Sequence, residues 1–147
     1  MKRVLTAVLA LVATAACGGS SNSTTSPSQV YTTDTLTGTV PVPVNGVLQS
    51  SFGTFAVGQG GGTIYFALTS AIETLPDGTF LPTVVMGLGI GTFNGSTCTL
   101  LPNATAQIAA SANQYQYTVA AGNYCIQMSD VTNQLGPVSY AIAIAHP

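Results

Sequence analysis

The chain has 147 residues, of which 46% are hydrophobic and only 4% are charged. This length is sufficient for one domain with a hydrophobic core, and the high hydrophobicity excludes an intrinsically disordered chain. Its only basic residues are Lys2 and Arg3. The rest of the chain therefore has no cation to neutralise phosphate groups, which excludes nucleic-acid binding and a basic membrane-binding patch.

The N-terminus has the pattern of a bacterial export signal. The basic start is followed by the uncharged, apolar run 4–16. A helix of that length reaches about 20 Å, which is too short for a membrane core of about 30 Å. We therefore expect a signal peptide at residues 1–16. The sequence Ala15-Ala16-Cys17-Gly18 resembles the bacterial lipobox, which implies that Cys17 becomes the lipidated first residue. The alternative is an ordinary signal peptide that leaves Cys17 free.

Residues 17–30 consist of the lipobox cysteine and a Ser/Thr/Gly-rich stretch without charge, which is typical of a flexible linker. The lipobox resemblance implies a diacylglyceryl group and an amide-linked acyl chain on Cys17, and two lipid signals anchor a protein stably. Gly18 favours export to the outer membrane or cell surface. We therefore expect a membrane partner through the anchor and a separate domain at residues 31–147.

The domain alternates between apolar and polar residues and shows no helical repeat. Val, Ile, Thr, Tyr and Phe dominate between Gly, Pro and Asn turns, which indicates short strands. The expected strands lie at residues 31–40, 48–57, 63–69, 83–92, 106–110, 115–119, 123–129 and 138–145. Seven or eight short strands without crossover helices predict an all-β fold, an antiparallel β-sandwich or jelly-roll-like domain.

One expected strand, at 83–92, has alternate small residues on one face, namely Val85, Gly87, Gly89 and Gly91. Alternate glycines weaken a strand and mark a bend or the close approach of another backbone. A sugar or peptide lying along the strand is one explanation. Tight packing or a bulge in a curved sheet is the explanation that we favour.

Three segments carry a family resemblance: Gly62-Thr63-Ile64-Tyr65-Phe66-Ala67-Leu68, Ala121-Gly122-Asn123-Tyr124-Cys125-Ile126 and Ser139-Tyr140-Ala141-Ile142-Ala143-Ile144. They resemble the bacterial pre-peptidase C-terminal domain, in which a later strand opens with Ala-Gly-x-Tyr and the last strand ends in an aliphatic alternation. The resemblance covers residues 35–147. It implies a β-sandwich that helps secreted proteins to localise or to bind extracellular polymers, sometimes with calcium. Acid-rich segments that could hold calcium are missing here.

Few residues could support catalysis. His146 is the only histidine and stands next to last, so we expect a solvated residue of a frayed end rather than a catalytic base. Glu73 and Asp77 are the closest pair of carboxyl groups, but the Pro-Asp-Gly turn already accounts for Asp77. We predict that the protein is not an enzyme and has no cofactor, with a carboxylate-dependent hydrolase as a remote alternative.

No Cys/His spacing predicts zinc. Asp130 and Asn133, together with backbone carbonyls, are candidates for a weak calcium site, and a loop-capping role of Asp130 is the favoured alternative. Tyr65 lies opposite the apolar face of its expected strand and is the candidate aromatic ligand contact. Tyr115 and Tyr117 share a face with Val119, which favours a place in the core.

The chain has three cysteines, so if Cys17 carries the lipid, Cys98 and Cys125 are the two that can pair. Disulfides persist in exported proteins, so we predict a Cys98–Cys125 bond that attaches a loop to a strand outside the main core. Two free buried thiols are the alternative.

These features predict a non-enzymatic, lipid-anchored extracytoplasmic β-sandwich that binds an extracellular polymer, either polysaccharide or protein. Binding predicts an exposed tyrosine or a groove with a glycine floor. The alternative is a structural or assembly protein that pairs through sheet edges or a flat uncharged face.

Overall fold

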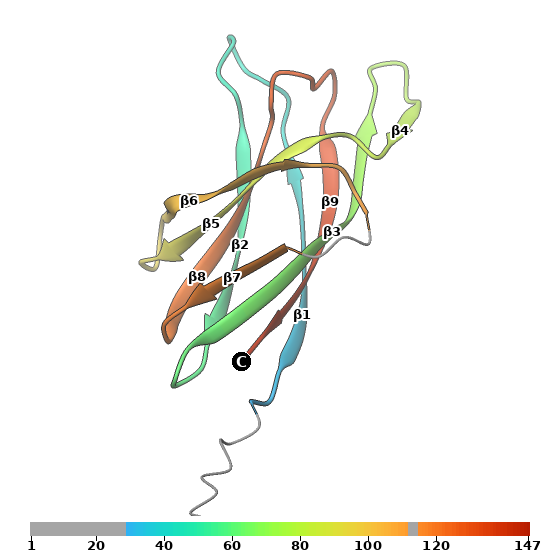
Figure 1. Cartoon of the computed structure of the whole chain (residues 1–147). Coiled ribbons are helices and arrows are strands. Elements are labelled where there is room, and N and C mark those ends of the chain that lie inside the picture. Colours follow the sequence, from blue (N-terminus) through green and yellow to red (C-terminus); the bar gives the residue numbers. More distant parts are fainter. Residues whose placement is uncertain (1–28, 112–114) are drawn as a thin grey trace, which may run out of the picture.

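The computed structural model describes residues 29–111 and 115–147, which are all-β and form nine strands without a helix (Figure 1). The strands are β1 (Thr32–Val40), β2 (Ser50–Val57), β3 (Gly62–Thr74), β4 (Phe80–Pro82), β5 (Met86–Phe93), β6 (Cys98–Ile108), β7 (Tyr115–Val119), β8 (Gly122–Ser129) and β9 (Val138–His146). The expected signal peptide, Cys17 and the linker up to residue 28 lie outside the described residues. Among the described residues, no helix is long and apolar enough to span a membrane.

The strands form two antiparallel sheets. In the first, called the β1 sheet, the order is β1-β9-β3-β4, and β7 pairs with another stretch of β3. In the second, called the β2 sheet, the order is β2-β8-β5-β6. The antiparallel β-sandwich predicted from the sequence is confirmed.

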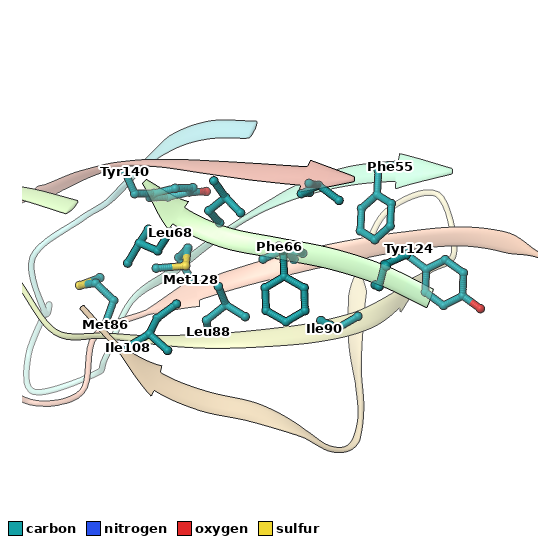
Figure 2. Close-up of a cluster of buried hydrophobic side chains, with 14 of the residues drawn as sticks. Phe55, Phe66, Leu68, Met86, Leu88, Ile90, Ile108, Tyr124, Met128 and Tyr140 are labelled. Carbon is teal, nitrogen blue, oxygen red and sulfur yellow. The ribbon is translucent and has the colours of Figure 1, made fainter. Parts of the chain in front are cut away.

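The core lies between the sheets and is built by the predicted alternation. Figure 2 shows Phe66 and Leu68 of β3 facing Leu88 of β5 and Met128 of β8. Ile126 and Met128 have no exposed surface, and full burial of such a side chain stabilises the fold by about 1.5–3 kcal/mol. Tyr115 and Tyr117 are half-buried against this core, as expected.

A bulge at Thr69 changes which face of β3 points inward. The register against β9 shifts between Leu68 and Ser70, and β3 continues to Thr74, whereas the expected strand ended at residue 69. Because the bulge adds one residue, Glu73 lies on the inner side and is only 2% exposed, while Ile72 points outward.

Two further strands differ from the expectation. Strand β4 was not predicted, because three residues are too few to show an alternation and Pro82 argues against a strand. Strand β6 begins at Cys98 rather than at residue 106. Its alternation is broken where residues 101–104 face the shift between Gly89 and Gly91, and Asn103 there has a positive φ of 56°.

Candidate functional site

The candidate site lies on the outer face of the β2 sheet. The register aligns its outward residues into rows across the strands. The first row is Ser50, Ser129, Gly87 and Gln107; the second is Phe52, Gln127, Gly89 and Thr105; the third is Thr54, Cys125, Gly91 and Leu100. Every residue of these rows is uncharged.

The predicted disulfide is confirmed on this face. The Cys98 and Cys125 sulfurs are 2.10 Å apart and their Cα atoms 5.8 Å apart. Cys98 is the first residue of β6, so the bond joins two strands that flank β5, and the expected attachment of a loop was wrong. Because the residues after the β5–β6 turn pair at once with β5, Cys98 is already in the sheet.

Gly91 of β5 lies where the disulfide crosses from β6 to β8, and only glycine fits there. A Cβ atom at Gly91 would lie 2.5 Å from the Thr99 carbonyl oxygen and 3.0 Å from the Cys125 sulfur. The backbone of β6 therefore approaches β5 more closely than a side chain would permit. At this position, the packing explanation of the glycine face is confirmed.

Beyond this crossing, the face is hollowed by a groove of about 300 Å³. Gly87 and Gly89 line it, and side-chain atoms of Ser129 and Leu100 lie close over them, 2.5 Å and 2.8 Å from where their Cβ atoms would be. Four polar side chains line it, namely Thr105, Gln107, Gln127 and Ser129, together with apolar Leu100 and Val131. The groove thus combines amide and hydroxyl groups, which donate and accept hydrogen bonds, with a small apolar surface.

A second hollow of about 600 Å³ lies toward the β5–β6 turn and is lined by Phe93, Asn94 and Asn123, among others. The rings of Phe52 and Phe93 are 5.9 Å apart, and Phe52 is 42% exposed. An aromatic pair therefore stands on the same face as the groove. Phenylalanine was not singled out from the sequence as a surface residue.

Glu73 and Asp77, the closest pair of carboxyl groups in the sequence, both accept hydrogen bonds from loop or turn groups. The Glu73 carboxyl group accepts the backbone N–H groups of Leu135 and Gly136, the latter at 2.7 Å. Asp77 accepts the backbone N–H and the hydroxyl of Thr79, and these hydrogen bonds lower the pKa of its exposed carboxyl group. Glu73 therefore fixes the β8–β9 loop, and Asp77 fixes a turn.

His146 is not the solvated residue that we expected. It is only 7% exposed, its Nε2 lies 3.0 Å from Asp34 Oδ2, and its ring is 5.5 Å from that of Phe55. The reason is that β9 pairs with β1 along its whole length, where Thr32 stands opposite His146. This end of the strand is consequently not frayed.

The two calcium candidates make hydrogen bonds to other groups of the domain. Asp130 Oδ1 accepts the Asn133 backbone N–H at 3.2 Å, as a loop cap does, and the Asn133 side-chain amide donates to the Val85 carbonyl at 3.0 Å. Asp130 Oδ2 is buried and has no hydrogen-bond partner within the part of the chain that the structure describes. Among the described residues, no three His, Cys, Asp or Glu side chains are grouped to hold a metal ion.

Tyr65 lies on the outer face of the β1 sheet, away from the groove, where it stands opposite Ala145 of β9. It is half-buried, and its ring is tilted against that of Tyr31 at 5.8 Å. A ligand contact at Tyr65 stays a prediction. The sequence reasoning missed the groove residues Gln127 and Thr105, although the alternate glycines mark the strand between them.

Comparisons with known proteins give only distant likenesses among solved structures. No protein-family model matches the chain, and no curated protein matches it. A solved structure with a similar outline comes from work titled "Bacillus endospore appendages form a novel family of disulfide-linked pili". It is 12% identical, covers 80% of this chain and 86% of its own, and superposes with a TM-score of 0.32. A likeness of this degree adds nothing to the fold and site described above.

Proposed function

We propose that this protein is an exported, lipid-anchored module that binds an uncharged extracellular polysaccharide in the groove of the β2 sheet. The observation that carries the proposal is the groove itself, which is lined by uncharged residues that include Gly87, Gly89, Gln127 and Thr105.

The chemistry of the groove favours a neutral, hydroxyl-rich ligand. Its lining contains no charged residue, so it offers nothing to compensate the charge of an ionic ligand. Glutamine and threonine side chains both donate and accept, as sugar hydroxyl groups do. Leu100, which is 40% exposed, supplies an apolar contact for the C–H face of a sugar ring.

The remaining parts of the proposal concern place and chemistry. The lipobox-like sequence around Cys17 supports a membrane anchor, and the uncharged residues that follow it support a tether. We further propose that the ligand is bound without being altered. The hydrogen bonds of Glu73 and Asp77 to loop and turn groups support this, because they give these carboxyl groups structural roles.

A binding experiment tests the groove. The purified full-length protein in detergent is applied to an array of uncharged glycans, and the dissociation constant is measured for any glycan retained. Changing Gln127 and Thr105 together to alanine removes two neutral hydrogen bonds of about 1 kcal/mol each. This corresponds to roughly thirtyfold weaker binding.

Two variants on the opposite sheet serve as controls. Gln116→Ala with Thr118→Ala makes the same change on the exposed face of β7, and binding is expected to stay within twofold of the unchanged protein. Tyr65→Ala separates the groove from the tyrosine predicted from the sequence. Lost binding in Tyr65→Ala with retained binding in the groove variant would move the site to the β1 sheet and refute the proposal.

A further inference from the structure

The edges of the two sheets differ in how they are protected. At the far edge of the β2 sheet, β6 is interrupted by a bulge with Pro102 and the positive φ of Asn103. At the corresponding edge of the β1 sheet, β7 has five residues and β4 has three, one of which is Pro82. Bulges, prolines and short strands are the devices that prevent an edge from pairing with another chain.

The other two edges, β1 and β2, lack these devices. Strand β1 has nine residues, pairs with β9 without a register shift and contains no proline. Strand β2 has eight residues and pairs with β8 in the same regular way. Each has a described strand partner on one side only. The two edges lie beside each other, because Leu36 of β1 packs against Gly53 of β2.

The exposed face of β1 is suited to pairing with itself. Its outward residues are all threonine, namely Thr33, Thr35, Thr37 and Thr39. Cross-strand threonine pairs stabilise a sheet, whereas like charges placed opposite each other destabilise it. Asp34 is the one charged residue of β1, and its carboxyl group is held by His146 of the same molecule.

We propose that β1 pairs antiparallel with β1 of a second copy of this chain, around a two-fold axis at Leu36. Leu36 is the middle residue of β1, so this register overlaps the full strand. It places Thr35 opposite Thr37 of the second copy and Thr33 opposite Thr39 of the second copy. Because Gly53 lies against Leu36, the same axis brings the β2 edges of the two copies toward each other.

The sequence of β1 favours a second copy of this chain as the partner of its free edge. An antiparallel edge pairs with its own sequence without further requirements, since both strands present backbone N–H and C=O groups in the same spacing. The two Asp34 residues would be four positions apart along the paired strands, or about 14 Å. Their mutual repulsion is therefore weak, and each is bonded to a histidine. This pairing goes beyond the proposed glycan binding and does not depend on it.

Cysteine cross-linking tests the register. In Leu36→Cys, each new thiol faces its own copy across the axis, within the Cα separation of 4.4–6.8 Å that a disulfide needs. In the exported protein we expect the main species to be a covalent dimer, which reductant converts to monomer. Thr33→Cys is the matched control, because its two copies would be about 20 Å apart along the strands, and it should remain monomeric.

Two charged variants test the edge without altering the core. Thr35→Lys with Thr37→Lys places lysine opposite lysine on exposed positions, whereas Gln116→Lys with Thr118→Lys adds the same charges at the far edge of the β1 sheet. Sedimentation of the full chain in density-matched detergent should give twice the chain mass for the unchanged protein and the β7 variant. The β1 variant should give the mass of one chain.

Partial burial of Leu36 makes a second cross-linking variant useful. Thr35→Cys with Thr37→Cys changes exposed positions only and should also link two copies. A single-chain mass for the unchanged protein, or no link in this variant while its circular dichroism is native, would overturn the pairing. Glycan binding is measured on the same samples, so a failed groove and a failed edge are distinguished.

Discussion

Substituting alanine for Gly91 tests the close approach of β6 to β5 beside the register shift. The new Cβ atom would meet the Thr99 carbonyl oxygen at 2.5 Å and the Cys125 sulfur at 3.0 Å. Neither neighbour is the end of a flexible side chain, because one belongs to the backbone and the other to a disulfide. The two strands must therefore move apart before Gly91→Ala can fold.

The expected cost follows from this geometry. Overpacking usually costs 1–3 kcal/mol, and contact with immobile atoms places Gly91→Ala at about 2–3 kcal/mol. For a domain of this size, 1 kcal/mol corresponds to roughly 4 °C in the melting temperature. Gly87→Ala is the matched control. Its Cβ atom would meet the Ser129 hydroxyl oxygen at 2.5 Å, which can rotate away, so we expect a cost below about 1 kcal/mol.

Thermal and urea unfolding followed by circular dichroism give both values. Free thiols are counted by alkylation and intact mass, so that only molecules with the Cys98–Cys125 bond are compared. A loss of 8 °C or more (roughly 2 kcal/mol) is expected for Gly91→Ala. Equal melting temperatures for the two variants would show that Thr99 of β6 does not approach Gly91 this closely, and the packing explanation of the glycine face would be wrong.

Three further sets of substitutions and one digestion test other features of the protein. Replacing Cys98 and Cys125 by serine opens a loop with a sequence separation of 27, and urea titration should show a loss of about 3.5 kcal/mol. Glu73→Ala leaves two loop N–H groups without their acceptor and should cost about 3 kcal/mol, whereas Glu73→Gln, which retains an acceptor oxygen, should cost less in the same titration. Cys17→Ser should abolish labelling by a fatty-acid probe and release the protein from membranes; unchanged labelling would contradict lipidation. Trypsin should leave the mature chain uncut even in urea, since no lysine or arginine follows residue 3, and any tryptic fragment would contradict the expected processing site.

Regular alternation was sufficient to predict much of the fold. Ile126 and Met128 are buried as the alternation of β8 required, and the glycines of β5 marked the strand where another backbone approaches. The pairing of Cys98 with Cys125 followed from the small number of cysteines in a chain that we expect to be exported. These predictions succeeded because each depends on neighbours along one strand or on composition.

The remaining features depend on contacts between distant strands. The bulge at Thr69 reverses the faces of β3 and buries Glu73, but no local sequence pattern predicts this bulge. His146 is buried because its ring lies against Phe55 of the other sheet and bonds to Asp34 of β1, which its place in the sequence does not show. The groove is built by residues of β5, β6 and β8, and only the pairing register brings Gln127 and Thr105 to the two sides of Gly89.

The uninterrupted pairing of β1 with β9 also has a mechanical consequence. Thr32 stands opposite His146, and the register continues unbroken to Val40 opposite Val138. A pulling force that enters at Thr32 along the strand axis, while a ligand holds the β2 sheet, loads these pairs in shear. The hydrogen bonds then share the tension together, whereas a force across the strands would open them one after another. The edge strand nearest to the expected tether is therefore placed where the domain resists being pulled from a surface.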